Sequence, residues 1–108
     1  MCFFVHLNKL FNFKQTVITE PTYGFELYCY EINNHILICS FHGGTKSIPP
    51  YTVVDLKVPS GYKDMTSTVS GNFKENKPLR YSSDGTLSII PSEGELSYNF
   101  YGELITFK

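Results

Sequence analysis

Hydrophobic and polar residues alternate in short runs along most of this 108-residue chain, and turn-forming residues separate the runs. Alternation with a period of two residues is typical of β-strands that bury one face. A succession of short strands is typical of sandwiches and small barrels, and we expect an all-β fold with a single antiparallel, jelly-roll-like β-sandwich. The pattern predicts strands at residues 14–19, 24–32, 35–41, 51–58, 66–73, 79–81, 86–90 and 96–108.

Two residue pairs predict hairpins between neighbouring strands. Asn33 and Asn34 tolerate a positive φ and separate two hydrophobic runs. Asp84 and Gly85 do the same in the second half of the chain, where glycine adopts a positive φ without strain. Both pairs are therefore expected to join antiparallel partners.

Three further residues are expected to end or bend predicted strands. Pro59 and Gly61 are expected to form the turn that ends the run at residues 51–58. The last run is long for a single strand, and Gly102 is the natural place for a bend in it.

Residues 1–23 are set apart from the sandwich predicted for residues 24–108. Apolar residues recur at three- and four-residue spacing over residues 3–11, which favours a short helix, with a first edge strand as the alternative. Residues 1–23 are therefore the candidate docking or inter-subunit segment. The start of the chain lacks a basic region and a small-residue cleavage site, so we expect no signal peptide. No run approaches about 18 apolar residues, so we expect no membrane insertion.

Composition supports the β prediction and argues against nucleic acid as a partner. The chain has eight Tyr and nine Phe but no Ala, so strand formers outnumber strong helix formers. Nine Lys and Arg balance ten Asp and Glu, and no run of like charge provides the basic stripe that binds phosphates.

The cysteines and histidines do not form a recognisable metal or catalytic motif. Cys2, Cys29 and Cys39 are odd in number, which favours reduced thiols, although Cys29 and Cys39 could face each other across the first hairpin. The closely spaced ligand pairs of zinc sites are absent, so no metal or cofactor is expected. Cys39 and His42 are the nearest approach to a nucleophile and base, but residues three apart in a strand point to opposite faces. We expect no enzyme activity.

Tyrosines are the candidates for ligand binding. Tyr28 and Tyr30 share one face of their predicted strand, which is either core and subunit interface or a platform for sugar rings. Tyr62 is a further candidate for stacking on a sugar. On the last strand, Tyr101, Ile105 and Phe107 form an apolar stripe on the outward face, which we expect to lie at an oligomer interface.

Two sequence motifs in fixed order suggest a family. VPSGYK at residues 58–63 is followed by SSDGTLSII at residues 82–90 and by a final aromatic strand. Over residues 24–108 this order resembles the C-terminal β-sandwich of tail-fibre and receptor-binding baseplate proteins of bacteriophages that infect Gram-positive bacteria. The family usually has a proline after the basic residue of the first motif, where this chain has Asp64.

The resemblance implies a non-catalytic homotrimer in the virion, assembled in the host cytoplasm together with other phage tail or virion proteins. It also implies host attachment, with a cell-wall saccharide as the receptor. Two other functions stay open: a virion structural or decoration protein without a receptor, and a carbohydrate-binding module of a carbohydrate-active enzyme.

Overall fold

The structure is a computed structural model that describes residues 13–70, 76–91 and 99–108. In these residues the chain forms β-strands, and all of the strand pairs are antiparallel, which confirms the all-β prediction. The strands are β1 (Phe13–Glu20), β2 (Phe25–Ile32), β3 (Ile36–His42), β4 (Val54–Lys57), β5 (Met65–Ser70), β6 (Lys77–Ser82), β7 (Thr86–Ile89) and β8 (Tyr101–Phe107).

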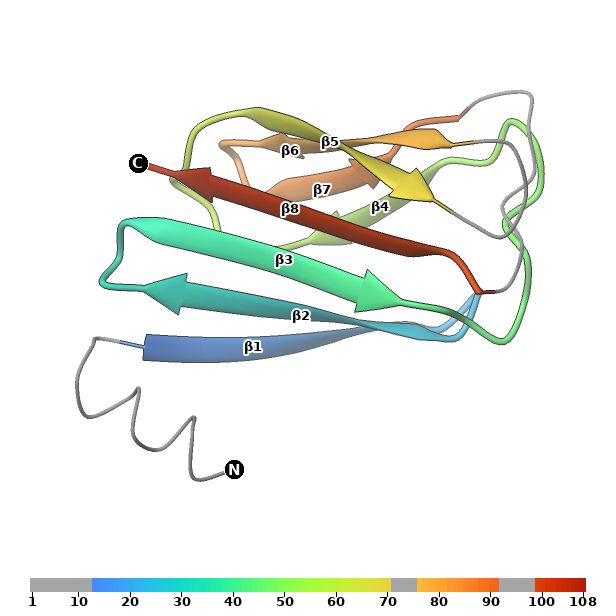
Figure 1. The fold of residues 1–108 in the computed structure, drawn as a ribbon, viewed down its shortest axis with the longest axis horizontal. Coiled ribbons are helices and arrows are strands. Elements are labelled where there is room, and N and C mark those ends of the chain that lie inside the picture. Colours follow the sequence, from blue (N-terminus) through green and yellow to red (C-terminus); the bar gives the residue numbers. More distant parts are fainter. Residues whose placement is uncertain (1–12, 71–75, 92–98) are drawn as a thin grey trace.

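The eight strands form one sheet in the order β1-β2-β3-β8-β5-β6-β7-β4. A short ladder, Val69 with Gly102 and Ser70 with Tyr101, joins β5 to β8 and so links two four-stranded halves. The sheet curls so that its two edge strands, β1 and β4, contact each other. Figure 1 shows β1, β2, β3 and β8 side by side in one half and β4, β5, β6 and β7 grouped in the other. The expected two-sheet sandwich is therefore not confirmed, and the arrangement is a nearly closed barrel.

The barrel interior holds a continuous hydrophobic core. In β2, β3 and β8 the inward side chains alternate with outward ones, as the period of two requires. Three aromatic rings pack together at one end of the core: Phe25 lies 5.2 Å from both Phe41 and Phe100, measured between ring centroids. The remaining buried core residues include Leu27, Cys29, Leu37, Cys39, Ile48, Val54, Leu56, Tyr62, Val69, Leu79, Tyr81, Leu87, Ile89 and Leu104.

Both predicted hairpins are present. Asn33 and Asn34 have φ angles of 54° and 55° between β2 and β3, and His35 N donates to Ile32 O at 3.0 Å. The β6–β7 connection spans three residues, with Gly85 at a φ of 92° and its N donating to Ser82 O. Glycine thus supplies the left-handed residue that commonly closes a three-residue hairpin.

The β4–β5 loop packs on the β6–β7 turn. Gly61 N donates to Ser83 O at 2.9 Å, and the Asp64 carboxylate accepts a hydrogen bond from Ser83 N at 2.8 Å. The Tyr81 hydroxyl lies beneath the loop and donates to Pro59 O at 2.8 Å. The two motifs that carry the family resemblance are therefore in contact, and Asp64 provides one of the links between them.

Some strand bounds differ from the prediction. The strand expected at residues 51–58 is only β4, because Tyr51 has a φ of 58°, which no extended strand accommodates. Gly102 lies in the sheet beneath the Phe41 ring instead of forming a bend. A Cβ on it would approach Phe41 Cζ to 2.6 Å.

The N-terminal segment contributes to the sheet, because β1 pairs with β2 along its whole length. The helix expected over residues 3–11 lies outside the described residues, as do residues 71–73 and 96–98 of the predicted strands.

Candidate functional site

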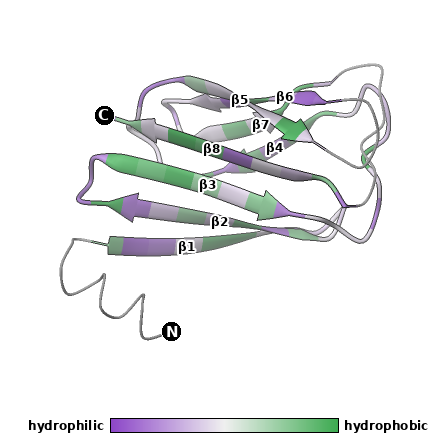
Figure 2. Cartoon of the chain, viewed as in Figure 1, coloured by the Kyte–Doolittle hydropathy of each residue, from purple (hydrophilic) through white to green (hydrophobic). Residues whose placement is uncertain are grey.

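The outward side chains of β1, β2, β3 and β8 form one surface, which we call the outer face. The strand register sets its rows: Tyr30 lies opposite Ile38, which lies opposite Ile105. The next row places Ile36 opposite Phe107. Figure 2 shows that much of β3, in the centre of this face, is hydrophobic.

The outer face exposes an unusual amount of apolar surface. Of the seven large hydrophobic residues that are exposed among the described residues, five lie on it. Exposed apolar residues that gather on one face mark a binding or assembly site more often than single scattered residues do. These five are Val17, Ile36, Tyr101, Ile105 and Phe107, with exposed fractions between 37% and 53%.

The structure brings two predicted sets of residues together. Tyr28 and Tyr30, the candidate ligand platform, share the outer face with the candidate interface residues Tyr101, Ile105 and Phe107. Both tyrosines are half-buried, and the Tyr30 ring stacks on Phe13 at 5.9 Å between centroids. Alternation within a strand predicts which residues share one side of that strand, but not which strands contribute to the same face of the sheet. The sequence therefore contained no signal that these two sets of residues lie on one face.

Tyr62 lies elsewhere, in the core, and is 2% exposed. Its hydroxyl donates to Glu31 Oε2 at 2.7 Å, and Lys108 Nζ lies 5.2 Å from its ring centroid. Its ring is therefore covered by the chain itself and joins the β4–β5 loop to β2.

Burial of Tyr62, together with its hydrogen bond to Glu31, raises the pKa of the phenol above its ordinary value of 10.0. Between this ordinary value and the raised one, the unfolded chain loses the proton while the folded chain keeps it. The free energy of unfolding must therefore fall as the pH rises above about 10. We expect Tyr62→Phe to flatten this decline in urea titrations at pH 8, 10 and 11. Tyr51→Phe, at a site 70% exposed, is the control, and an equal flattening by both variants would contradict the assignment.

A hollow of about 250 Å³ lies at the end of the outer face nearest the start of β2. Here the Tyr28 hydroxyl donates to Glu26 Oε1 at 3.1 Å, and the His42 ring stacks on Tyr101 at 6.3 Å between centroids. Aromatic rings beside a carboxylate and hydroxyls can hold a polar, ring-shaped ligand. The lining residues are Gly24, Phe25, Glu26, Tyr28, Ser40, Phe41, His42 and Gly43.

Sequence reasoning did not select Glu26, Ser40 or His42 for this hollow. Glu26 is one of ten Asp and Glu residues spread along the chain, and only the β2–β3 register places Ser40 opposite Tyr28. The one available signal for Glu26 was its position two residues before Tyr28 in the same strand, since this spacing places both side chains on the same side of the strand.

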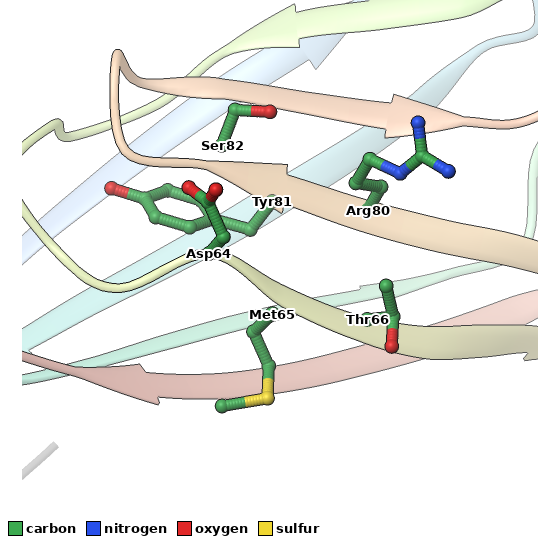
Figure 3. Close-up of a pocket in the computed structure, with 6 residues that line it drawn as sticks. All are labelled: Asp64, Met65, Thr66, Arg80, Tyr81 and Ser82. Carbon is green, nitrogen blue, oxygen red and sulfur yellow. The ribbon is translucent and has the colours of Figure 1, made fainter.

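A second hollow, of about 310 Å³, lies over β5 and β6 (Figure 3). Thr66 lies opposite Arg80 in the strand register, and Asp64 and Tyr81 also line this hollow. The Asp64 carboxylate is already engaged by Ser83 N, so its main role is to hold the loop. An adjoining hollow shares Asp64 and adds Lys63 and Lys108. Each of these hollows is also lined by a tyrosine, but Tyr81 and Tyr62 are buried, so their rings present little surface to a ligand.

The candidate catalytic and metal residues do not converge. Cys39 points into the core, whereas His42 is exposed on the outer face. Cys29 lies opposite Cys39, as expected, with 4.0 Å between the two Sγ atoms. Among residues 13–70, 76–91 and 99–108, no three His, Cys, Asp or Glu side chains are grouped as metal ligands.

Comparisons with known proteins do not assign the chain to a family. No family model matches the sequence, and no curated protein and no solved structure matches it significantly.

The described part contains no helix long and apolar enough to cross a membrane.

Proposed function

We propose that this chain is a non-catalytic module that assembles with further copies of itself through the outer face. As the family resemblance implies, the assembly would be a homotrimer that attaches a phage tail fibre or baseplate to a saccharide of the host surface. The observation that carries the proposal is the concentration of exposed apolar side chains on β1, β3 and β8.

The outer face has the chemistry of a protein interface. The outward side of β8 carries three exposed apolar residues, Tyr101, Ile105 and Phe107. On β3, the exposed Ile36 lies opposite Phe107. Burial of apolar surface contributes roughly 25 cal/mol per Å², and a closed symmetric assembly can bury the face in every subunit. The module therefore gains stability by association.

Saccharide attachment is proposed for the polar end of the same face. Tyr28 and His42 offer rings, and Glu26 offers a carboxylate in the 250 Å³ hollow. Tyr30 belongs to the neighbouring apolar region, so its part would be to support Tyr28 or to lie within the interface.

We propose that the two halves of the barrel are equivalent to the two sheets of the sandwich that the resemblance implies. The β1-β2-β3-β8 and β5-β6-β7-β4 halves would correspond to its two sheets, with the two-residue β5–β8 ladder as the seam. The two motif segments that carry the resemblance contact each other in this barrel.

The assembly proposal predicts a large change in mass for a double variant. We expect the wild-type chain to be a trimer at micromolar concentration and Tyr101→Ser/Ile105→Lys to be a monomer, because both side chains are about half exposed in the single chain and would be buried between subunits. Size-exclusion chromatography with light scattering measures the mass.

Tyr51→Ser/Val53→Lys provides the matched control, since these residues are 70% and 61% exposed but lie outside the outer face. This control should remain trimeric. A monomeric wild type, or a double variant on β8 that keeps the wild-type mass, would refute the proposed interface.

The attachment proposal has its own measurement. Binding of the intact assembly to a saccharide array would support a receptor-binding role, and the absence of binding would favour a virion structural or decoration protein. Release of short sugars from a polysaccharide would instead indicate a carbohydrate-active enzyme.

A further inference from the structure

Cys29 and Cys39 form a cross-strand pair at the centre of the core. They lie directly opposite each other in the β2–β3 ladder, and their Sγ atoms are 4.0 Å apart. Both residues are free thiols with 0% exposure. The turn at Asn33 and Asn34 sets this register, so the alignment follows from the hairpin itself.

The backbone positions of such a pair are compatible with a covalent bridge. Directly opposed residues in an antiparallel ladder have Cα atoms roughly 4.5–5.5 Å apart, within the range of about 4.4–6.8 Å that disulfides require. Both side chains point to the same side of the sheet, because opposed residues always do. Rotation of the two thiols toward each other is then the main movement needed.

We propose that Cys29 and Cys39 form an intrachain disulfide when the chain meets an oxidised low-molecular-weight thiol, such as oxidised glutathione. One cysteine thiolate attacks a sulfur of the external disulfide, forms a mixed disulfide and releases one small thiol. The second cysteine thiolate attacks the bound sulfur of the first, forms the Sγ–Sγ bond and releases the other small thiol. Two electrons pass to the external disulfide, and the two protons lost by the cysteines appear on the released thiols.

Burial controls when the bridge can form. The hydrogen bond with Cys29 and desolvation raise the pKa of the Cys39 thiol, and an external disulfide cannot reach either sulfur in the closed barrel. Oxidation therefore requires local opening of the hairpin, and its rate follows the population of the open form. Once formed, the bridge is enclosed by the core and resists small reductants for the same reason.

The bridge would stabilise the outer face although its two cysteines lie on the inward side of the sheet. Cys29 lies between Tyr28 and Tyr30 on β2, and Cys39 lies between Ile38 and Ser40 on β3. A covalent link between the inward positions fixes the register of the outward ones on the outer face. The inference does not depend on trimer formation or on saccharide binding.

The test uses the full chain with Cys2→Ser, which removes the third thiol. The protein is incubated with oxidised glutathione, free thiols are alkylated, and a protease that cleaves after glutamate cuts at Glu31, between the two cysteines. We expect the fragments on either side of Glu31 to remain joined and to separate after reduction. The melting temperature should rise by about 5–10 °C on oxidation.

A second protein, Cys2→Ser/Cys29→Ala, controls for mixed disulfides and should show no rise in melting temperature with oxidised glutathione. If this variant does not fold, the linked fragments and the melting shift of the Cys2→Ser protein suffice. The inference is overturned if both cysteines remain alkylatable after an exposure that oxidises the urea-unfolded chain. It is also overturned if oxidation lowers the melting temperature.

Discussion

Replacing Gly102 by alanine is expected to lower the free energy of unfolding by about 2–3 kcal/mol, because the new methyl group overlaps a ring that cannot move away. The added Cβ would lie 2.6 Å from Phe41 Cζ and 2.9 Å from Phe41 Cε1. Phe25 and Phe100 hold that ring in place from within the core. Urea denaturation monitored by circular dichroism measures the change.

Two further variants test the physical cause. Glu103→Ala, at the neighbouring exposed position of β8, should change stability by less than about 0.5 kcal/mol. Gly102→Ala/Phe41→Leu should cost less than the sum of its two single changes, because the smaller side chain at position 41 makes room for the methyl group. Additive costs would show that the overlap between Gly102 and Phe41 is not the origin of the loss.

Gly85→Ala is expected to destabilise the protein more than Gly61→Ala, although both glycines have nearly the same backbone conformation. Their φ angles are 92° and 95°, so an alanine at either site carries a conformational strain of about 1–2 kcal/mol. Only Gly85 also lacks space, because a Cβ there would lie 2.7 Å from Val58 O and 3.1 Å from Ser60 Cβ. Nothing lies within 4 Å of a Cβ on Gly61.

The difference between the two variants isolates steric overlap from backbone strain. We expect Gly85→Ala to lower the free energy of unfolding by about 1–3 kcal/mol more than Gly61→Ala does. Val58 N donates a hydrogen bond to Gly85 O, so the backbone at Val58 cannot easily move away from the new Cβ. Melting temperatures of the two variants, measured side by side, check the expectation. Equal losses would mean that the β4–β5 loop moves aside and does not pack firmly on the β6–β7 turn.

Local signals predicted the strands well where each strand has one buried side. In β2, the alternation of Phe25, Leu27 and Cys29 with Tyr28 and Tyr30 identified the strand but left open which side is buried, and the structure buries the side of Phe25, Leu27 and Cys29. The same signal failed near β4, because two prolines and the left-handed Tyr51 delay the extended backbone until Val54. Hydrophobic residues in that region contribute to the core or remain exposed without belonging to a strand, and periodicity cannot distinguish these outcomes.

The candidate site was predicted only in parts. Tyr101, Ile105 and Phe107 were selected as an outward stripe, and the structure places all three on an exposed face. Tyr62 was selected with Tyr28 because both are aromatic, yet Tyr62 is buried against Glu31. Residue type alone does not report burial, since a tyrosine satisfies its hydroxyl as readily with a neighbouring carboxylate as with water.

By itself, the sequence determined the all-β composition of this protein, its hairpin turns and the positions of most strands, because these depend on residues adjacent in the chain. The tertiary structure alone decided that β8 lies between β3 and β5, and this placement joins the two halves into one nearly closed barrel. It also decided that the outward residues of β2, β3 and β8 form a single face. Strand order and register arise from contacts between residues far apart in sequence, where many pairings satisfy the same alternation and only the packing of the complete core selects one.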